Sequence, residues 1–189
     1  IDIVLGAAEN DIAKRFIPHA VKSGAVVIDN SSAYRLDADV PLIIPEVNPE
    51  AIHEHHGIIA NPNCATIIAL VALQPLHAQA KIKRMIVSTY QAVSGAGVNG
   101  IKELDSQIDA LRCDQPVDIQ TFQHQIAFNL IPQIGGFDEA GYSSEEMKMQ
   151  NEGRKILHRE DLCISCTCVR VPVVRSHSIA IELVTKEEL

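Results

Sequence analysis

The sequence contains no tryptophan, and aromatic residues make up only 4% of its 189 residues. Basic side chains are also in the minority, because 16 Lys and Arg stand against 24 Asp and Glu, which leaves a net charge of −8. Nucleic acids and anionic membranes favour basic surfaces, so this balance argues against both as partners. The longest apolar runs are far shorter than the ~20 residues that a membrane-spanning helix needs. We therefore expect no nucleic-acid partner and no membrane association.

Signals for secretion are missing as well. The chain begins at Ile1 without an initiator methionine or a basic segment, and its first residues are typical of a strand. Residues 185–189 resemble the start of a helix more than the end of a domain. We therefore expect this chain to be a fragment of a longer protein.

The cysteines predict free thiols. There are five, an odd number, and without secretory signals a reducing, cytoplasmic location is the ordinary expectation. Cys163, Cys166 and Cys168 lie close together, but a structural zinc site requires a second pair of ligands at a similar spacing, which the sequence lacks. The alternating pattern favours buried cysteines on a strand, so we expect no metal.

The first third of the chain has the pattern of an α/β domain. With 47% hydrophobic residues the chain can bury a sizeable core. Short apolar strands alternate with a helix that a glycine closes, which predicts parallel pairing through helical crossovers. The expected elements are a strand at 3–5, a helix at 9–23, a strand at 25–29 and a strand at 57–60.

The pattern changes after residue 63, where we place a domain boundary. Longer strands with helices between them favour a second, α+β domain over residues 64–189. Residues 114–142 are rich in Pro and Gly and predict a long loop region, and the helix that follows opens with serines and acids. The expected elements are helices at 65–79, 99–111 and 143–157, and strands at 85–93, 163–174 and 178–184.

Cys64 is the strongest candidate for chemistry. It follows the polar turn Asn61-Pro62-Asn63 and stands where the helix at 65–79 begins. A helix N-terminus stabilises a thiolate, and a thiolate is a nucleophile suited to covalent catalysis at a carbonyl. Most cysteines of soluble proteins are simply buried, so on this evidence alone both interpretations stay open.

A cysteine nucleophile usually works with a histidine. Of the eight histidines, His177 has the most distinctive surroundings, because it lies in a connection between two strands together with Arg170 and Arg175. Arginine forks bind carboxylates and phosphates, so this stretch also indicates an anion, although a solvated charge pair on an edge strand is the alternative. The other histidines have no such setting.

Glycine-rich turns give only weak signals. Residues 94–97 (SGAG) follow a strand and could let a phosphate or a nicotinamide approach the backbone, but a plain turn is the better interpretation. The sequence has no complete G-x-G-x-x-G motif, and Gly6 after the first strand is merely suggestive.

Seven short motifs follow one another through the chain: DNSSAYR at 29–35, VPLIIPEVN at 40–48, NPNCATI at 61–67, YQAVSGAG at 90–97, IAFNLIP at 126–132, EEMK at 145–148 and RVPVVRSHS at 170–178. Each is modest alone, but in this order they resemble aspartate-semialdehyde dehydrogenases over essentially the whole chain. The resemblance implies the C-terminal part of a Rossmann-type dinucleotide-binding domain at 1–63. It also implies a catalytic and dimerisation domain with a mixed sheet at 64–189, and a homodimer or homotetramer.

The resemblance further implies the reductive dephosphorylation of aspartyl phosphate to aspartate semialdehyde, a step in lysine, threonine and methionine biosynthesis, with NADP as cofactor. Cys64 would form the thioester, His177 would be the general acid/base, and Gln91 would orient the substrate. Ser94 and Gly95 would contact the nicotinamide side of the cofactor.

The substrate would be held by charge. By the same resemblance, Arg170 would bind its α-carboxylate and Glu145 would lie near its amino group. Arg35 and Lys148 would bind the phosphate. Glu145 and Lys148 are three residues apart, so they share a face of one helix. Two cations for phosphate and one for carboxylate suit a doubly anionic substrate even on an acidic protein.

Some departures and alternatives remain. The Gly-rich NADP loop of the family would lie before Ile1, so we expect this polypeptide alone to bind NADP poorly and to be inactive. N-acetyl-glutamyl-phosphate reductase is a neighbouring interpretation, but there a glycine typically precedes the nucleophile, whereas here it is Asn63. Glyceraldehyde-3-phosphate dehydrogenase has a different cysteine motif. A non-catalytic paralogue would be expected to lose Cys64, Gln91 or His177, and all three are present.

Overall fold

The computed structural model describes residues 1–188, which form two compact units. The first unit comprises Ile1–Arg84, Lys148–Cys163 and the residues from Val184 on, and the second comprises Met85–Met147 and Ile164–Leu183. The domain boundary that we expected after residue 63 stays a prediction. By compactness alone, the helix that begins at Cys64 belongs with the first unit.

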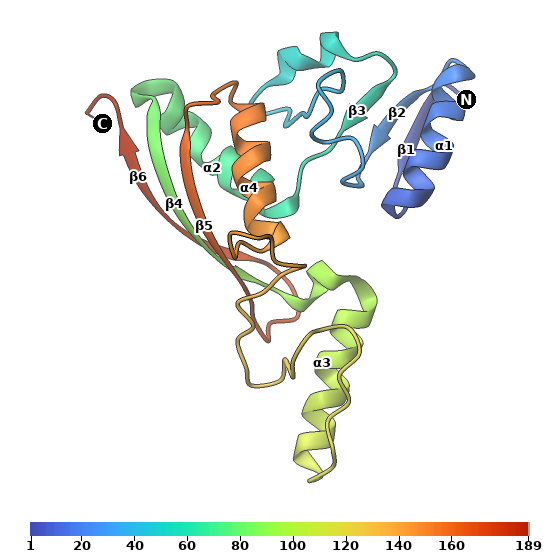
Figure 1. The fold of residues 1–189 in the computed structure, drawn as a ribbon, viewed down its shortest axis with the longest axis vertical. Helices are drawn as coiled ribbons and strands as arrows, with labels where there is room; N and C mark the ends of the chain where they lie inside the picture. Colours follow the sequence, from blue (N-terminus) through green and yellow to red (C-terminus); the bar gives the residue numbers. More distant parts are fainter. Residues whose placement is uncertain (189) are drawn as a thin grey trace. The chain divides into compact units, whose positions relative to one another are not determined.

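The first unit contains a parallel three-stranded sheet (Figure 1). Its strands lie in the order β1-β2-β3, with Ile3 opposite Val26 and Val27 opposite Ile58. Helix α1 forms the crossover from β1 to β2, as the alternating pattern predicted. The bounds are β1 (Ile3–Gly6), α1 (Asn10–Lys22), β2 (Val26–Asp29) and β3 (Ile58–Ala60).

Helix α1 is amphipathic and packs its apolar side on the sheet. Ala13 and Ile17 are buried one turn apart and form a core cluster with Val27 of β2. The chain then turns sharply at Gly24, whose φ of +89° is a conformation that glycine adopts without steric cost. This turn allows β2 to begin two residues later.

A compact loop and a short 3-10 helix, η1 (Pro49–Glu54), precede β3. Asn48 organises this loop, because its Oδ1 accepts the Ile44 N–H at 2.9 Å and its Nδ2 donates to the Leu42 carbonyl at 3.0 Å. Leu42 and Ile44 are buried, so the apolar run between the two prolines is part of the core.

Helix α2 (Cys64–Ala80) begins at Cys64. Asn63 caps it, since its side-chain oxygen accepts the N–H groups of Ala65 at 2.9 Å and Thr66 at 3.4 Å. The first turn therefore has a defined geometry, and the expectation of a helix start at the NPNCATI motif is confirmed.

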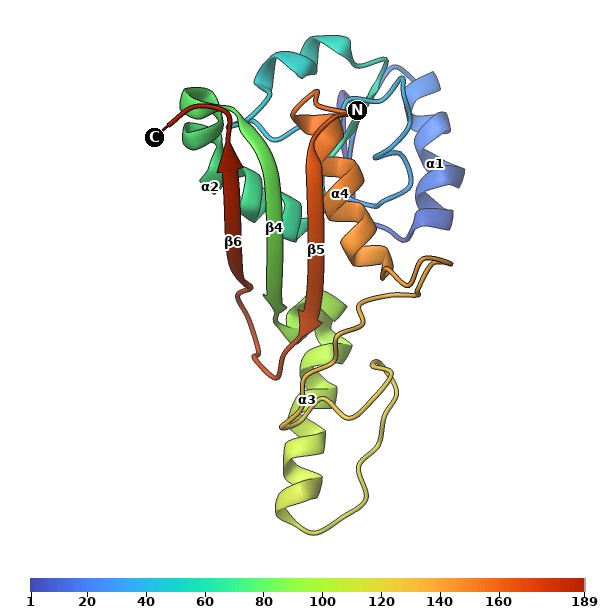
Figure 2. The same ribbon diagram turned by 60° about the vertical axis from the view of Figure 1, so that its left-hand side comes forward.

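The second sheet contains β4 (Ile82–Gln91), β5 (Cys163–Arg170) and β6 (Ser178–Thr185) in the order β5-β4-β6. Figure 2 shows β4 and β5 running in the same direction and β6 in the opposite one, so the sheet is mixed. Along β4, buried and exposed side chains alternate, with Val87 and Thr89 on the buried face. The expected fold class is confirmed.

The cysteines of β5 follow its two faces. Cys166 and Cys168 are buried, as expected, and burial raises the pKa of the Cys168 thiol to about 11. Cys163 is exposed, so the expectation that it is buried was wrong, because the strand places odd-numbered positions on the outer face. Among residues 1–188, no three His, Cys, Asp or Glu side chains lie together as metal ligands would.

A short 3-10 helix, η2 (Val93–Ala96), leads from β4 into α3 (Gly97–Arg112), and a long connection returns from α3 to α4 (Figure 2). Two buried polar residues of α3 hold this connection. Gln107 Oε1 accepts the N–H groups of Ile126 at 2.9 Å and Ala127 at 3.0 Å. Glu103 accepts those of Gln120 and Thr121.

Helix α4 (Ser144–Ile156) starts with a capping box at Ser143. The Ser143 N–H donates to Glu146 Oε2 at 2.7 Å, and the Ser143 hydroxyl accepts the Glu146 N–H at 3.5 Å. The serines and acids that predicted this helix are therefore its actual N-terminal signal.

None of the helices within residues 1–188 is both long and apolar enough to cross a membrane.

The Gln107 hydrogen bonds yield a stability prediction. In Gln107→Met the side chain keeps its length, but two buried N–H groups lose their acceptor. We expect the free energy of unfolding to fall by about 2 kcal/mol. Urea denaturation measures this change, with Gln115→Met, at an exposed glutamine, as the matched control. Equal midpoints for the two variants would contradict the assignment.

Candidate active site

Cys64 lies at the start of α2 with its side chain exposed. The polar turn before it sets this position, because the Asn63 cap fixes the first turn of the helix. The dipole of a helix N-terminus favours a negative charge at this position, which is the charge that a cysteine would carry as a thiolate. The structure therefore places an exposed thiol at the start of α2.

Arg35 follows the loop after β2, and its side chain is held in place. Only 8% of the residue is exposed. Its Nη1 donates to Glu152 Oε1 at 3.0 Å, and its Nη2 donates to the Asn30 carbonyl at 3.0 Å. Within residues 1–188, its buried Nε has no hydrogen-bond partner. The guanidinium is therefore fixed by one hydrogen bond from each of its two Nη atoms.

Glu152 of α4 links Arg35 to the turn at Asn63, which precedes Cys64. Its second oxygen, Oε2, accepts the N–H of Asn63 at 2.7 Å. Burial raises the pKa of this carboxyl, while the charge of Arg35 and the Asn63 N–H oppose the rise. We call Arg35, Asn63, Cys64 and Glu152 the first cluster; all four belong to the first unit. Lys148 lies one helical turn before Glu152 on the same face of α4.

Gln91 and Glu145 meet in the second unit. Gln91, the last residue of β4, is 1% exposed, and its Nε2 donates to Glu145 Oε1 at 3.1 Å. The Thr89 hydroxyl donates to Gln91 Oε1 at 2.9 Å, which fixes the orientation of the amide. Two residues predicted from separate motifs are therefore neighbours.

His177 is fixed by the backbone of β4's end. The N–H of Ala92 donates to His177 Nδ1 at 3.0 Å, so the neutral imidazole carries its proton on Nε2. Burial, and after it the charge of Arg170, lowers the pKa of His177, while Glu145 acts in the opposite direction. The ring is therefore a neutral hydrogen-bond donor near pH 7.

Arg170, the last residue of β5, lies next to His177. Its Nη1 donates to the carbonyl of Ala92 at 2.7 Å, and the Phe122 ring lies 6.0 Å from its Cζ. Gly95 leaves room beside both side chains, because a Cβ there would come within 2.7 Å of Arg170 Nη1 and 3.4 Å of His177 Cε1. Gln91, Glu145, Arg170 and His177 form the second cluster, with Ser94 and Gly95 on the adjoining turn.

Some residues were judged differently by sequence and structure. Arg175, grouped with Arg170 from the sequence, is exposed. Glu152 was missed, because an acid inside a polar helix carries no signal of its own, and only its spacing of four from Lys148 could have suggested a role. The hydrogen bonds of the Ala92 backbone to His177 and Arg170 could not be predicted either, because an alanine side chain carries no functional group.

Comparison with known proteins gives the class. A model of the semialdehyde dehydrogenase NAD-binding domain matches residues 1–55, and one of the semialdehyde dehydrogenase dimerisation domain matches residues 73–189. The chain therefore belongs to the semialdehyde dehydrogenase family.

Its relatives within that family are aspartate-semialdehyde dehydrogenases. The enzyme of Aquifex aeolicus is 51% identical over 193 residues, a match that covers 100% of this chain and 56% of the relative. The crystal structure of aspartate semialdehyde dehydrogenase II from Vibrio cholerae, complexed with ASA, has a TM-score of 0.99 at 46% identity and covers 100% of this chain and 57% of that one.

A more distant structure is that of the Candida albicans enzyme with NADP, with a TM-score of 0.74 at 27% identity over 100% of this chain and 51% of that one. The resemblance inferred from the motifs is confirmed. The chain spans about half the length of the curated relatives that it matches.

The lowered pKa of His177 predicts a pH effect on stability. As pH falls below ~6.5, the unfolded state takes up the proton before the folded state does, so stability is lost as pH approaches the folded pKa. Protonation also removes the acceptor of the Ala92 N–H. We expect His177→Gln to flatten this acid decline.

Thermal unfolding between pH 7 and pH 5 measures the effect, with His124→Gln, at an exposed histidine, as the control. An acid decline in His177→Gln as steep as in the unchanged chain would contradict the assignment of a neutral, half-buried histidine.

Proposed function

We propose that this chain carries the catalytic residues of an NADP-dependent aspartate-semialdehyde dehydrogenase. The reaction is the reductive dephosphorylation of aspartyl phosphate to aspartate semialdehyde through a thioester on Cys64. The observation that carries the proposal is the second cluster, in which the Ala92 backbone holds His177 and Arg170, and Gln91 holds Glu145. The relatives named above support the choice of substrate.

Cys64 is the proposed nucleophile. Its thiolate attacks the acyl carbon of aspartyl phosphate, the C–O bond to the phosphoryl group breaks, and phosphate leaves with the electron pair. A thioester then links the substrate to Cys64. After reduction, the resulting hemithioacetal collapses, releasing the semialdehyde and returning the thiolate.

His177 supplies the proton chemistry in this proposal. The Ala92 N–H occupies Nδ1, so the neutral ring carries its proton on Nε2, and this N–H is proposed to donate a hydrogen bond to the developing oxyanion. The lowered pKa suits that role because it keeps the ring neutral near pH 7, and as a general acid/base the ring would first take up a proton and then return to its neutral form when it gives that proton up. Gln91, held by Thr89 and Glu145, orients the substrate.

The proposed substrate has two anionic groups, an α-carboxylate and a phosphate, and cationic side chains would bind both. Arg170 is proposed to grip the α-carboxylate, and the carboxylate of Glu145 to lie near the amino group. Arg35 and Lys148 are proposed for the phosphate, and the fixed guanidinium of Arg35 supports that role. Arginine suits both tasks, because its planar fork matches carboxylate and phosphate geometry.

NADPH, when bound, supplies the hydride that reduces the thioester. Gly95 is proposed to contact the nicotinamide end of this cofactor, since the absence of a Cβ lets this turn lie directly against Arg170 and His177. Ser94, on the same turn, would help to orient the ring. Homodimer or homotetramer formation through the dimerisation domain, and a cytoplasmic location in keeping with the free thiols, complete the proposal.

The nucleophile assignment predicts a specific loss. Cys64→Ser, made in the whole protein, should lower the phosphate-dependent oxidation of aspartate semialdehyde by NADP at least ~10³-fold, because a hydroxyl in place of the thiol is a far weaker nucleophile. Steady-state absorbance of NADPH measures it. Cys163→Ser, at another exposed thiol, is the control and should keep its activity. Retained activity in Cys64→Ser would refute the mechanism.

The carboxylate assignment predicts a different pattern. Arg170→Lys keeps the charge but loses the bidentate fork, so kcat/KM for the semialdehyde should fall about 10²-fold. Arg175→Lys changes the same residue type in the exposed connection next to His177 and should leave kcat/KM within about twofold. Equal effects of the two substitutions would overturn the role of Arg170.

A further inference from the structure

Glu152 is a buried charge that the proposed reaction does not use. The residue is 1% exposed, and it lies in the middle of α4. A buried carboxylate costs several kcal/mol unless its oxygens are paired. The partners of its two oxygens therefore explain how this carboxylate is stabilised in the core.

Those groups are two candidate functional elements. One oxygen accepts from the Arg35 guanidinium at 3.0 Å, and the other accepts from the Asn63 N–H at 2.7 Å. Asn63 caps α2, and Cys64 is the next residue. A single carboxylate thus ties an anion-binding side chain to the loop that carries the thiol.

Lys155 lies one turn after Glu152 on α4 and bonds the backbone of the loop that contains Arg35. Its Nζ donates to the carbonyls of Arg35 at 2.9 Å, Asp37 at 2.6 Å and Val40 at 2.7 Å. Glu152 therefore holds the side chain of Arg35, and Lys155 holds its main chain. Three acceptors use all three protons of the ammonium group.

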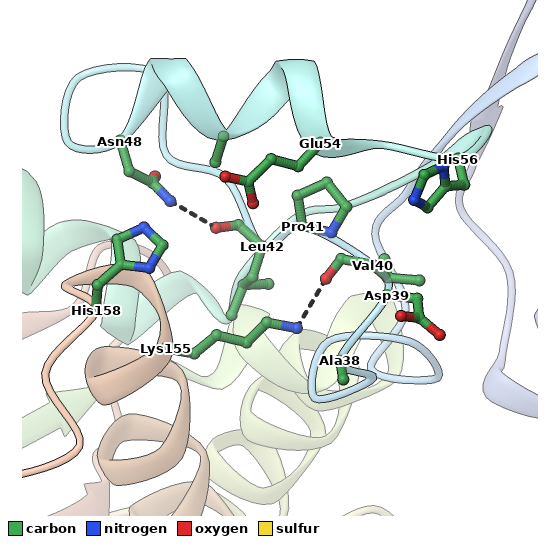
Figure 3. Close-up of a pocket in the computed structure, with 11 residues that line it drawn as sticks. Ala38, Asp39, Val40, Pro41, Leu42, Asn48, Glu54, His56, Lys155 and His158 are labelled. Carbon is green, nitrogen blue, oxygen red and sulfur yellow. Dashed lines mark hydrogen bonds between the residues drawn. The ribbon is translucent and has the colours of Figure 1, made fainter.

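The pocket in Figure 3, of about 350 Å³, lies beside this support. The figure shows Lys155 reaching across it to Val40, and Asn48 bonded to Leu42. Both polar side chains are already engaged with carbonyls of the loops that line the pocket. Lys155 therefore holds the loop around Arg35 from one wall of this pocket.

We propose that Glu152 is a positioning residue for the reaction of Cys64: it joins Arg35 and the Asn63-Cys64 loop into one preassembled anion site, and Lys155 supports it. The proposal rests on the proposed function for the roles of Arg35 and Cys64. It adds that α4 carries the structural basis of the site, with Lys148, Glu152 and Lys155 spaced on neighbouring turns.

Charge coupling follows from this arrangement. Arg35 opposes the rise in the pKa of Glu152 that burial causes, so it favours the ionised carboxylate. In return, the carboxylate offsets the positive charge of Arg35 close to the loop that carries Cys64. Removing the negative charge should therefore favour the Cys64 thiolate, and removing Arg35 should disfavour it.

The test is Glu152→Gln in the 189-residue chain, with Cys113 and Cys163 changed to Ser so that Cys64 is the remaining exposed thiol. A glutamine has one acceptor oxygen where the carboxylate has two, so Arg35 and Asn63 cannot both keep their partner. Two measurements follow: the pH dependence of Cys64 alkylation by iodoacetamide, and the rate of tryptic cleavage after Arg35.

We expect the alkylation midpoint to move down by about half a pH unit, because one negative charge is lost at the N-terminus of α2, where Glu152 accepts from the N–H of the residue before Cys64. Cleavage after Arg35 should accelerate about tenfold, because trypsin needs the side chain that Glu152 holds. Cleavage after Arg112, whose side chain is 74% exposed, serves as the internal reference.

Two variants separate positioning from general stability. Glu103→Gln removes another buried carboxylate, whose partners Gln107, Gln120 and Thr121 all belong to the second unit. It should lower the melting temperature but move neither measurement. Glu152→Asp keeps the charge but is too short to reach both partners, so cleavage should accelerate while the alkylation midpoint stays.

A double-mutant cycle tests the coupling. Without Arg35, burial favours the protonated form of Glu152, so Glu152→Gln should shift the alkylation midpoint much less in an Arg35→Gln background. An equal shift in both backgrounds would overturn the coupling. Unchanged alkylation and cleavage in Glu152→Gln would overturn the proposal, and Glu152→Asp decides it by cleavage if Glu152→Gln fails to fold. Neither measurement needs substrate or cofactor, so failure here is distinct from retained activity in Cys64→Ser.

Discussion

The carboxylate of Glu152 shares its two oxygens between a guanidinium and a backbone N–H, and the geometry of the first cluster depends on that division. A buried charge must be paired or it becomes too costly to keep, so this one constraint fixes Arg35 and the loop at Asn63 together. The Asn63 cap then carries the constraint into α2, where the first residue is Cys64. A requirement of stability therefore also sets the position of the exposed Cys64 thiol.

In the second cluster, too, one residue holds two others in place, but here it does so through its backbone. Ala92 offers its N–H to His177 and its carbonyl to Arg170, so a residue without functional chemistry of its own determines the state of two that have it. The Ala92 hydrogen bond selects the Nε2–H form of His177, and the neighbouring arginine helps to keep the ring neutral. Gly95 contributes because it lacks a Cβ, which would come within 2.7 Å of Arg170 Nη1 and would require that side chain to shift.

Local signals predicted much of the fold. The Asn-Pro-Asn turn predicted the start of α2, and Ser143 and Glu146 form a capping box at the expected start of α4. Gly24 makes the turn that follows α1, as expected. These features succeed because the interactions behind them span a few residues. The error at Cys163 has the opposite origin: an alternating strand pattern does not say which of its two faces the rest of the chain will cover.

The sequence by itself determined the family, the α/β and mixed-sheet pattern, and the candidate residues of the proposed site, because motifs and periodicities encode them. Tertiary structure decided the partners: Gln91 with Glu145, His177 with the Ala92 backbone, and Arg35 with Glu152. Each of these contacts joins residues that are far apart in the chain, and no local spacing encodes them. Burial then shifted their pKa values, because it raises the pKa of Glu152 and lowers that of His177 in the folded protein.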